Sequence, residues 1–463
     1  MSNIEKDVSN ISIIEKTTLS KITTSQIKKL VKFTGFVMNI KIGKKFSFII
    51  IRDQTITIQC ISNTTLEIKK ITNESFVEIE GEVCETKNLV KSCSIQNIEI
   101  NVKKLKILSL SDSNLPFPYK DVSYNIQDQI KYGVNPVSYH LCLDNRSLYM
   151  RSPQGYSFVR LINGFMFSFR EFLHKSEFIE VKTPKLIEGA SEGGANCFTV
   201  DFFKQKACLA QSPQLYKQMC IIGGLKKVYE IGHVYRAEES NINRYLSEFV
   251  GYDLEMEIDG DYNNLIYFIY DLLKYIFKYI EREYKQELEI IKQYYPFDDF
   301  KMLETPVVLT HRECIDLLKS ENIEIDYNDD FNNENEKKLG KIIKQKYITD
   351  IFVCKDYPVS CRPFYTYVDK DTNLTRSYDF IVRGEEVLSG AQRINQYNEL
   401  LEAVKANNIN PDSLKGYLEA FKIGAPPHGG CGMGLERLMK AYFGSKDIRH
   451  FSLFPRDPNR LYP

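Results

Sequence analysis

The residue types best suited to chemistry lie after position 190, in three clusters that combine charged side chains with glycine. The first cluster is the run Gln211-Ser-Pro-Gln-Leu-Tyr-Lys-Gln, which follows the loop Ser191-Glu-Gly-Gly-Ala-Asn. Paired glycines beside polar side chains are typical of a loop that closes over a ligand. Taken alone, the same residues also fit an ordinary glycine turn.

The second cluster carries two arginines in a short loop between two strand-like segments. Arg236 is followed closely by Glu238, and Arg244 precedes Phe249 and the alternating acids of Asp253-Leu-Glu. A hairpin of this kind could direct guanidinium groups at phosphate oxygens in bidentate geometry. Solvated charges at strand edges are the alternative interpretation.

The third cluster lies near the C-terminus. Asp379, Glu386 and Ser389 supply oxygen ligands of the kind that Mg²⁺ prefers. The run Gly432-Met-Gly-Leu-Glu-Arg joins glycines to an arginine in the first turn of a predicted helix, a second arrangement suited to phosphate. Neither a Gly-x-Gly-x-x-Gly fingerprint nor a Walker loop occurs, so neither Rossmann nor P-loop chemistry is indicated.

The composition narrows the class of protein. The 463 residues include 61 Lys and Arg against 61 Asp and Glu, and this balance excludes a wholly basic nucleic-acid coat. Eleven cysteines without a Cys-x-x-Cys pair, and six scattered histidines, indicate free thiols in a reducing compartment and no zinc site. The chain starts without a secretory-like segment, and no apolar run reaches the ~18–20 residues that span a bilayer. We therefore predict a soluble, cytoplasmic protein without membrane contact.

The elements that must position these clusters begin with a predicted barrel. Between residues 31 and 110 apolar and polar residues alternate, as in half-buried strands. Five strands and one short helix in so few residues favour a small closed barrel such as the OB-fold, with a generic antiparallel sheet as the alternative. Residues 1–109 carry a net charge of +6, which fits an anionic partner or chance segregation. The predicted strands are Val31–Ile40, Phe46–Arg52, Thr55–Ile61, Phe76–Val83 and Ile98–Ile107, and the helix is Thr64–Ile71.

The remaining chain predicts a large α+β domain behind a connector. Apolar residues at helical spacing predict helices over Tyr156–Lys175 and Leu265–Glu283, and Val181–Pro184 has the texture of an extended strand. Proline, asparagine and serine between residues 111 and 145 indicate a hinge. The predicted organisation is a flexible N-terminal extension (1–30), the barrel (31–110), the connector (111–145) and the α+β domain (146–463).

Taken together and in this order, these features resemble motifs 1, 2 and 3 of the class II aminoacyl-tRNA synthetases. Motif 1 covers about residues 156–188 and ends near Pro184, motif 2 covers about 228–258, and motif 3 covers about 424–445. The resemblance implies an N-terminal OB-fold and a class II catalytic domain with an antiparallel sheet flanked by helices. Within the class, the runs that begin at Ser191, Gln211, Arg362 and Gly384 resemble aspartyl-tRNA synthetases of the eukaryotic and archaeal type.

The resemblance implies a two-step reaction. L-Aspartate is activated by ATP, with Mg²⁺, to aspartyl-adenylate, and the aspartyl group then passes to the 3′ end of tRNA-Asp. Both steps develop negative charge on oxygen, so fixed cations are expected to matter more than proton transfer. Arg236 and Arg437 match the catalytic positions, at the α- and γ-phosphate respectively. The matching ATP-binding positions are Arg236, Glu238, Arg244, Tyr245, Phe249, Glu386, Gly434 and Arg437, and the magnesium positions are Asp379, Glu386 and Ser389.

The choice of amino acid follows from the same resemblance. Lys217 and Arg393 match the positions that face the side-chain carboxylate of the substrate, and asparaginyl relatives lack the lysine. Two cations around one pocket favour an anion, whereas the neutral amide of asparagine would leave them under-compensated. The matching aspartate-binding positions are Glu192, Ser212, Gln214, Lys217, Arg236, Asp253, Ser389 and Arg393.

Two macromolecular partners are implied as well. Phe48, Gln59 and Glu99 match the positions that read the tRNA anticodon, an aromatic face for stacking and polar groups for base edges. Core packing of Phe48 and a solvated Glu99 are the alternatives. Motif 1 implies a homodimer through the apolar stripe of Tyr156–Lys175, unless that stripe covers the sheet of its own subunit. No motif bears on membership of a multi-synthetase assembly.

One residue departs from the resembled pattern. Tyr245 stands where the family has a histidine near the ATP phosphates, and a tyrosine donates one hydrogen bond without becoming cationic. Other functions stay open: a non-discriminating aspartyl-tRNA synthetase that also charges tRNA-Asn, or an asparaginyl-tRNA synthetase. An ammonia-using asparagine synthetase is disfavoured by the attached barrel. An inactive tRNA-binding paralogue is disfavoured by Arg236, Glu386 and Arg437.

Overall fold

The computed structural model describes residues 14–65, 67–188, 197–238 and 243–463. The chain divides into two compact units, residues 1–156 and 157–463. All eleven cysteines lie within the described residues and are free thiols. Among the described helices, none is both long and apolar enough to cross a membrane.

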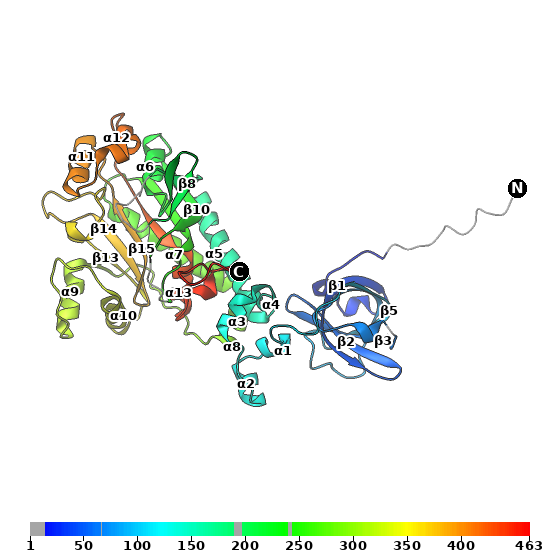
Figure 1. Ribbon diagram of the computed structural model, residues 1–463. Coiled ribbons are helices and arrows are strands. Elements are labelled where there is room, and N and C mark those ends of the chain that lie inside the picture. Colours follow the sequence, from blue (N-terminus) through cyan, green and yellow to red (C-terminus); the bar gives the residue numbers. More distant parts are fainter. Residues whose placement is uncertain (1–13, 66, 189–196, 239–242) are drawn as a thin grey trace. The chain divides into compact units, whose positions relative to one another are not determined.

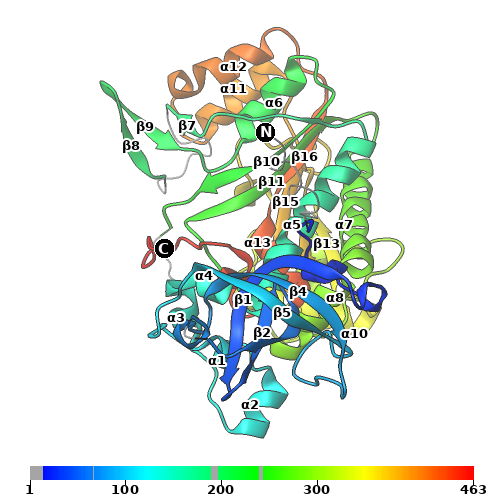
Figure 2. The same ribbon diagram turned by 90° about the vertical axis from the view of Figure 1, so that its right-hand side faces the viewer.

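The N-terminal unit is built on a closed five-stranded barrel with the strand order β1-β2-β3-β5-β4 (Figures 1 and 2). Alternate side chains point inward, so that Phe33, Ile49, Ile58 and Ile100 are buried in its core. This topology confirms the predicted barrel. The strands are β1 (Leu30–Ile42), β2 (Phe46–Asp53), β3 (Ile56–Asn63), β4 (Phe76–Glu85) and β5 (Ile98–Ser109).

The segment before the barrel corrects one expectation. Leu19 and Ile22, predicted within a flexible extension, are buried in the barrel core, and short 3-10 helices cover Leu19–Lys21 and Thr24–Gln26. Burial of these apolar side chains holds residues 14–29 against the barrel, while residues 1–13 lie outside the described residues. The predicted helix over residues 64–71 is a 3-10 turn at Ile68–Lys70, with residue 66 outside the described residues.

The connector is more ordered than its composition predicts. The buried Arg52 and Glu74 form an ion pair with 2.7 Å between Nη2 and Oε2, and Arg151 Nη1 lies 3.0 Å from the same oxygen. The Arg52 guanidinium also lies 3.7 Å from the centre of the Tyr119 ring. These contacts fasten residues 119–151 to the barrel within the N-terminal unit. The connector helices are α1 (Tyr119–Val122), α2 (Ile126–Tyr132), α3 (Tyr139–Asp144) and α4 (Arg146–Tyr149).

The C-terminal unit is organised around an eight-stranded sheet with the order β12-β13-β14-β15-β16-β11-β10-β6. Its neighbours are antiparallel except at β12–β13 and β10–β6. A smaller sheet has the order β7-β9-β8. The strands are β6 (Ile179–Glu180), β7 (Leu186–Ile187), β8 (Thr199–Phe202), β9 (Gln205–Leu209), β10 (Lys227–Tyr235), β11 (Glu248–Glu257), β12 (Val308–Thr310), β13 (Ile351–Lys355), β14 (Ser377–Val382), β15 (Glu385–Gln392) and β16 (His428–Gly434). The predicted strand at Val181–Pro184 is therefore wrong, since these residues follow β6 outside any regular element.

Helices α5 and α7 cover one face of this sheet (Figures 1 and 2). Phe165 and Phe169 of α5 are buried against it, so the apolar stripe of this helix mostly covers the sheet of its own subunit. α9 and α10 form a separate pair near β13, and α6, α11 and α12 share a further apolar cluster. The helices are α5 (Pro153–Lys175), α6 (Gln214–Ile222), α7 (Asn263–Glu283), α8 (Lys285–Tyr294), α9 (His311–Ser320), α10 (Asn333–Tyr347), α11 (Tyr397–Ala406), α12 (Lys415–Phe421) and α13 (Leu435–Phe443).

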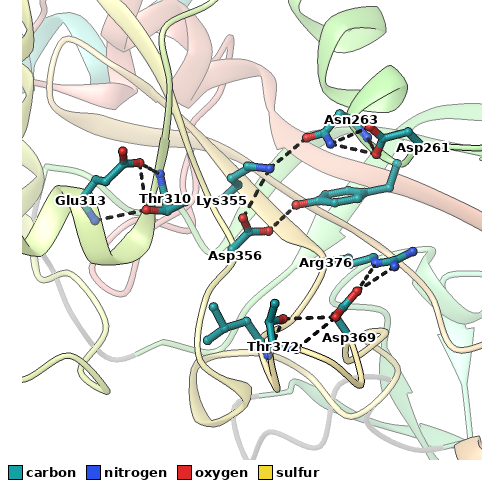
Figure 3. A network of polar contacts seen from close by, with 11 residues as sticks. Asp261, Asn263, Thr310, Glu313, Lys355, Asp356, Asp369, Thr372 and Arg376 are labelled. Carbon is teal, nitrogen blue, oxygen red and sulfur yellow. Dashed lines mark hydrogen bonds and ion pairs between the residues drawn. The ribbon is translucent and has the colours of Figure 1, made fainter.

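A polar network fixes the start of α7 against the end of β13 (Figure 3). Lys355 Nζ donates to Asn263 Oδ1 over 3.1 Å and lies 3.4 Å from Asp356 Oδ2. Nearby, Arg376 donates to Asp369 and to the side chain of Gln392. Because Gln392 is the last residue of β15, this network also orders the strand end that precedes Arg393.

Candidate active site

A cavity of about 350 Å³ lies on the sheet face opposite α5 and α7. Alternation along β11 explains its position: Tyr252 and Leu254 pack into the helix-side core, whereas Gly251 and Asp253 line the cavity. Most of the predicted site residues are brought together here. Those that line it are Ser212, Gln214, Arg236, Glu238, Arg244, Tyr245, Phe249, Asp253, Glu386, Ser389, Arg393, Gly434 and Arg437.

Three of the residues predicted to bind ATP, aspartate or magnesium are not in that lining. Lys217 and Asp379 are buried beside the cavity, 2% and 4% exposed, and act through their neighbours. Glu192 lies outside the described residues. The sequence therefore predicted residues that the fold brings together, but not which of their side chains lie behind the cavity wall.

One end of the cavity is formed by Phe249 on β11. The Arg236 guanidinium lies 5.6 Å from the centre of the Phe249 ring and 3.8 Å from Glu238 Oε1. The next residue, Val250, donates its backbone N–H to both carboxylate oxygens of Glu436 over 3.2 and 3.1 Å. Burial raises the pKa of Glu436 to about 8. The contact between Glu436 and Val250 therefore fixes motif 3 against β11, the strand that carries Phe249.

Arg437 and Tyr245 form a second part of the wall. The Arg437 guanidinium lies 5.7 Å from the centre of the Tyr245 ring, within the range of a cation–π contact. Arg437 Nη1 also donates to the backbone oxygen of Glu386 over 3.4 Å. Tyr245 thus supports an arginine with its ring face.

The predicted magnesium residues divide into two groups. Glu386 and Ser389 line the cavity, whereas Asp379 Oδ2 accepts a short hydrogen bond from Arg362 and lies in the wall. Arg362 also donates to Ser389 Oγ over 3.3 Å. Burial, followed by the nearby Asp379 charge, raises the pKa of Glu386 to about 7. A carboxylate and a hydroxyl that line the same cavity are an oxygen donor set that suits Mg²⁺.

Within the described residues no group of three or more His, Cys, Asp or Glu side chains forms a metal site by itself. Mg²⁺ in nucleotide sites is generally held by one or two carboxylates together with phosphate oxygens. The pair of Glu386 and Ser389 fits that pattern. Asp379 stays a predicted ligand, because Arg362 engages only its Oδ2, and its Oδ1 is buried without a hydrogen-bond partner among the described residues.

The predicted pair of cations is already compensated by acids. Lys217 Nζ lies 3.1 Å from Asp253 Oδ1 and 3.4 Å from Glu255 Oε2, and it donates to the backbone oxygen of Cys431 over 2.9 Å. Arg393 donates to Glu255 over 2.9 and 3.3 Å and to Gln214 Oε1 over 3.3 Å. Burial tends to raise the pKa of Glu255, but Arg393 and Lys217 outweigh it, so this pKa is lowered. Two cations therefore face two carboxylates in this network, and the aspartate-binding role of Lys217 and Arg393 stays a prediction.

Glycines on β16 allow this buried network to form. A methyl group at Gly430 would lie 2.0 Å from the backbone oxygen of Leu254, so no larger residue fits between β11 and β16. The backbone oxygen of Gly430 accepts from Arg393 over 3.0 Å and from the Tyr378 hydroxyl over 3.1 Å. The glycine-rich run thus brings strand backbone within reach of the arginine.

Sequence reasoning missed three residues as members of the site. Glu255 is completely buried between the two cations, and Arg362 bridges Asp379 and Ser389. A sequence signal for Glu255 did exist: Asp253 and Glu255 alternate with apolar residues, which puts both acids on one face of the strand. Acidic side chains buried in this way need partners. Glu336 on α10 lies outside every motif and had no sequence signal.

The predicted anticodon residues lie on the outer face of the barrel. Phe48 is 41% exposed, which is not the core position of the alternative interpretation. Gln59 Nε2 donates to Glu99 Oε2 over 2.7 Å across the neighbouring strands β3 and β5. The exposed ring of Phe48, together with the hydrogen-bonded pair of Gln59 and Glu99, forms a surface that could contact unstacked bases.

Comparison with known proteins places this geometry in a family. Residues 138–458 match the model described as tRNA synthetases class II (D, K and N), and residues 31–108 match an OB-fold nucleic acid binding domain. A relative from Encephalitozoon cuniculi, named "Probable aspartate--tRNA ligase, cytoplasmic", is 52% identical and covers 99% of this chain and 100% of its own.

Two solved structures are similar over nearly the whole length. The aspartyl tRNA synthetase from Entamoeba histolytica has a TM-score of 0.87 at 34% identity, covering 100% of this chain and 96% of that chain. The asparaginyl-tRNA synthetase from Pyrococcus horikoshii, complexed with asparaginyl-adenylate, has a TM-score of 0.81 at 28% identity, covering 97% and 100%. With its cavity, its barrel and these matches, the chain belongs to the class II tRNA synthetases of the D, K and N group.

Proposed function

We infer that this protein is an aspartate–tRNA ligase, an enzyme that activates L-aspartate with ATP and transfers the aspartyl group to tRNA. The observation that carries this inference is one cavity lined by Arg236, Arg244, Arg437 and Arg393, with Lys217 buried directly behind its wall against Asp253. The guanidinium groups of Arg236, Arg244 and Arg437 suit a polyphosphate. Arg393 and the buried Lys217 suit a small anionic amino acid. Relatives with half of their residues identical carry the corresponding name.

ATP occupies the arginine-lined part of the cavity in this proposal. Phe249 stacks on adenine, with Gly434 leaving room beside the ring, where an added methyl would lie 3.7 Å from the ring carbons. Glu238 accepts a hydrogen bond from the adenine amino group. Arg236 holds the α-phosphate, and Arg244 and Arg437 hold the remaining phosphates through charge-assisted hydrogen bonds.

The first step joins aspartate to the α-phosphorus. The α-carboxylate oxygen of aspartate forms a bond to phosphorus, and the bond to the pyrophosphate oxygen breaks. Arg236 stabilises the charge that develops on the α-phosphate oxygens, and Arg437 stabilises the departing pyrophosphate. In the second step the 3′ hydroxyl of tRNA attacks the activated carbonyl and AMP leaves.

Glu386 and Ser389 are the residues that would hold Mg²⁺. When bound, the ion neutralises phosphate charge and orients the phosphates. Arg362, which also lines the cavity, keeps Ser389 in place through a 3.3 Å hydrogen bond, and Asp379 lies buried beside it as a further candidate ligand.

Aspartate is selected by the charge balance behind the cavity. Gln214 and Ser212 line the wall, and Arg393 reaches the cavity from β15 with its guanidinium anchored to Glu255. A substrate carboxylate draws on Arg393 and on the buried Lys217, while Asp253 faces the α-ammonium. Asparagine lacks the charge that would interact with both cations.

The barrel binds the anticodon of tRNA-Asp in this proposal, through Phe48, Gln59 and Glu99. Charging assays with tRNA-Asp and tRNA-Asn transcripts test the assignment. We expect aspartyl transfer to tRNA-Asp, and no aspartate-dependent charging of tRNA-Asp would overturn it. Equal charging of tRNA-Asn would support the non-discriminating enzyme instead.

We also propose a cytoplasmic homodimer. Phe167, Ile179 and Leu186 are 48%, 49% and 49% exposed, and β6 is a short strand at an open sheet edge. Large exposed apolar side chains beside an unpaired edge favour an isologous contact. Light scattering should give about twice the 53.9 kDa chain mass, and a fully active monomer would contradict the dimer.

A further inference from the structure

Helix α10 lies outside the three motifs and yet carries a carboxylate to the phosphate side of the cavity. Glu336 belongs to the first turn of α10 and is only 5% exposed. The side chain of Asn332 caps this turn by accepting from the backbone N–H groups of Glu334 and Asn335 over 2.9 and 3.0 Å. The cap fixes where the helix begins and therefore where Glu336 lies.

The Glu336 carboxylate joins two parts of the ATP site. Its Oε2 accepts from Arg244 Nη2 over 2.8 Å and from the backbone N–H of Glu386 over 2.8 Å, and its Oε1 accepts from the same arginine nitrogen over 3.2 Å. Arg244 comes from the loop between β10 and β11, and Glu386 is the proposed magnesium residue on β15. One side chain thus sets the distance between an arginine and the strand that holds the metal residue.

Backbone packing keeps Glu336 in this position. A methyl group on Gly340 would lie 2.6 Å from Gly384 Cα, and one on Gly384 would lie 2.7 Å from Lys337 Cα. Gly384 has φ of +75°, in the left-handed region that favours glycine. The turn between β14 and β15 therefore touches the backbone of α10 directly, which leaves Glu336 little freedom to move relative to Glu386.

Arg244 keeps donor capacity for a ligand. Its side chain is 12% exposed and lines the cavity, and its Nε is buried without a hydrogen-bond partner among the described residues. An unpaired buried donor is costly unless a ligand satisfies it. Because Glu336 engages Nη2, the guanidinium is held in one orientation at the cavity wall.

We propose that Glu336 is a positioning residue of the ATP site, which orients the Arg244 guanidinium toward the polyphosphate at a fixed distance from Glu386. The proposal rests on the proposed function. Without the carboxylate, Arg244 must lose rotamer freedom each time ATP binds, and ordering a long side chain weakens binding. The interaction with the amino acid should be untouched, because Glu336 contacts neither Arg393 nor Lys217 among the interactions described.

The test compares Glu336→Gln with Glu334→Gln, whose carboxylate lies on the same helical turn and is exposed. Aspartate-dependent ATP–pyrophosphate exchange should show KM for ATP about tenfold higher in E336Q, with KM for aspartate within about twofold of wild type. E334Q should match wild type. An unchanged KM for ATP in E336Q, or a rise of both KM values together, would overturn the proposal.

A double-mutant cycle separates positioning from general stability. If Glu336 acts through Arg244, the E336Q/R244Q enzyme should have the same KM for ATP as R244Q alone. The proposal would be overturned if the increases in KM for ATP of the two single variants multiplied in the double variant. It would also be overturned if the E336Q protein failed to fold. A wild-type protein without aspartate-dependent exchange would instead refute the proposed function, so the two failures are distinguishable.

Discussion

Replacing Lys217 by methionine removes a buried positive charge from between two carboxylates. The ammonium lies 3.1 Å from Asp253 and 3.4 Å from Glu255, and all three side chains are at most 8% exposed. At an effective dielectric constant of about 20, each of these attractions amounts to about 5 kcal/mol before desolvation is counted. Since methionine fills a similar volume, the variant isolates the loss of charge.

Two effects of Lys217→Met follow from these contacts. Breaking a buried ion pair by removing one partner generally costs about 3–5 kcal/mol, so the thermal midpoint should fall by several degrees. In the cavity, a substrate carboxylate would then meet two acids with only Arg393 to oppose them. We expect KM for aspartate to rise on the order of 100-fold, or about 2.7 kcal/mol, while KM for ATP changes by less than about threefold.

The assay is amino-acid-dependent ATP–pyrophosphate exchange, with separate titrations of aspartate and ATP. Lys226→Met is the matched control, because Lys226 is an exposed lysine just before β10. The ratio of kcat/KM for aspartate to kcat/KM for asparagine should fall in K217M and stay unchanged in the control. An unchanged KM for aspartate together with an unchanged thermal midpoint would refute the view that Lys217 balances the acids of the cavity.

Two further predictions concern the barrel and helix α9. Phe48→Ala removes a stacking surface of about 1–3 kcal/mol per base, so kcat/KM for tRNA should fall about 5- to 150-fold while tRNA-independent exchange is retained; equal loss of both activities would make Phe48 a folding residue. Burial lowers the pKa of His311 from 6.5 to about 4, with a smaller opposing effect of its contact to the Asp329 backbone. Because the folded-state value is depressed, neutral His311 contributes its stability above about pH 6.5, and up to about 3 kcal/mol is lost as the pH falls toward 4. His311→Phe should therefore reduce the drop in thermal midpoint between about pH 7.5 and 5, whereas the exposed-site control His174→Asn should not; equal drops in all three proteins would contradict the reasoning.

Local patterns predicted the barrel strands, the two long helices and the segments that line the cavity. Alternation in residues 31–107 predicted the barrel strands to within a few residues, because one face of each strand is buried. The ordered glycine and arginine runs predicted which segments line the cavity. The same reasoning failed for residues 14–29, where Leu19 and Ile22 complete the barrel core although no clear periodicity marks them.

Contacts between distant segments could not be predicted in this way. Lys217 is 214 residues from the Cys431 oxygen that it contacts, and Glu336 is 92 residues from Arg244. No periodicity indicates which buried acid compensates which cation, so the pairing of Lys217 and Arg393 with Glu255 was not predicted. The stripe of α5 shows the same limit, since spacing identifies an apolar face without saying which surface covers it.

The measurement closest to the central claim is tRNA-independent ATP–pyrophosphate exchange by the wild-type protein with aspartate and with asparagine. Because Arg393 lines the cavity and Lys217 lies buried behind its wall, kcat/KM for aspartate should exceed that for asparagine by at least about 100-fold, or about 2.7 kcal/mol. Arg437→Ala should lose exchange with either amino acid and serves as the negative control. Comparable exchange with aspartate and asparagine, or exchange with asparagine alone, would contradict the assignment.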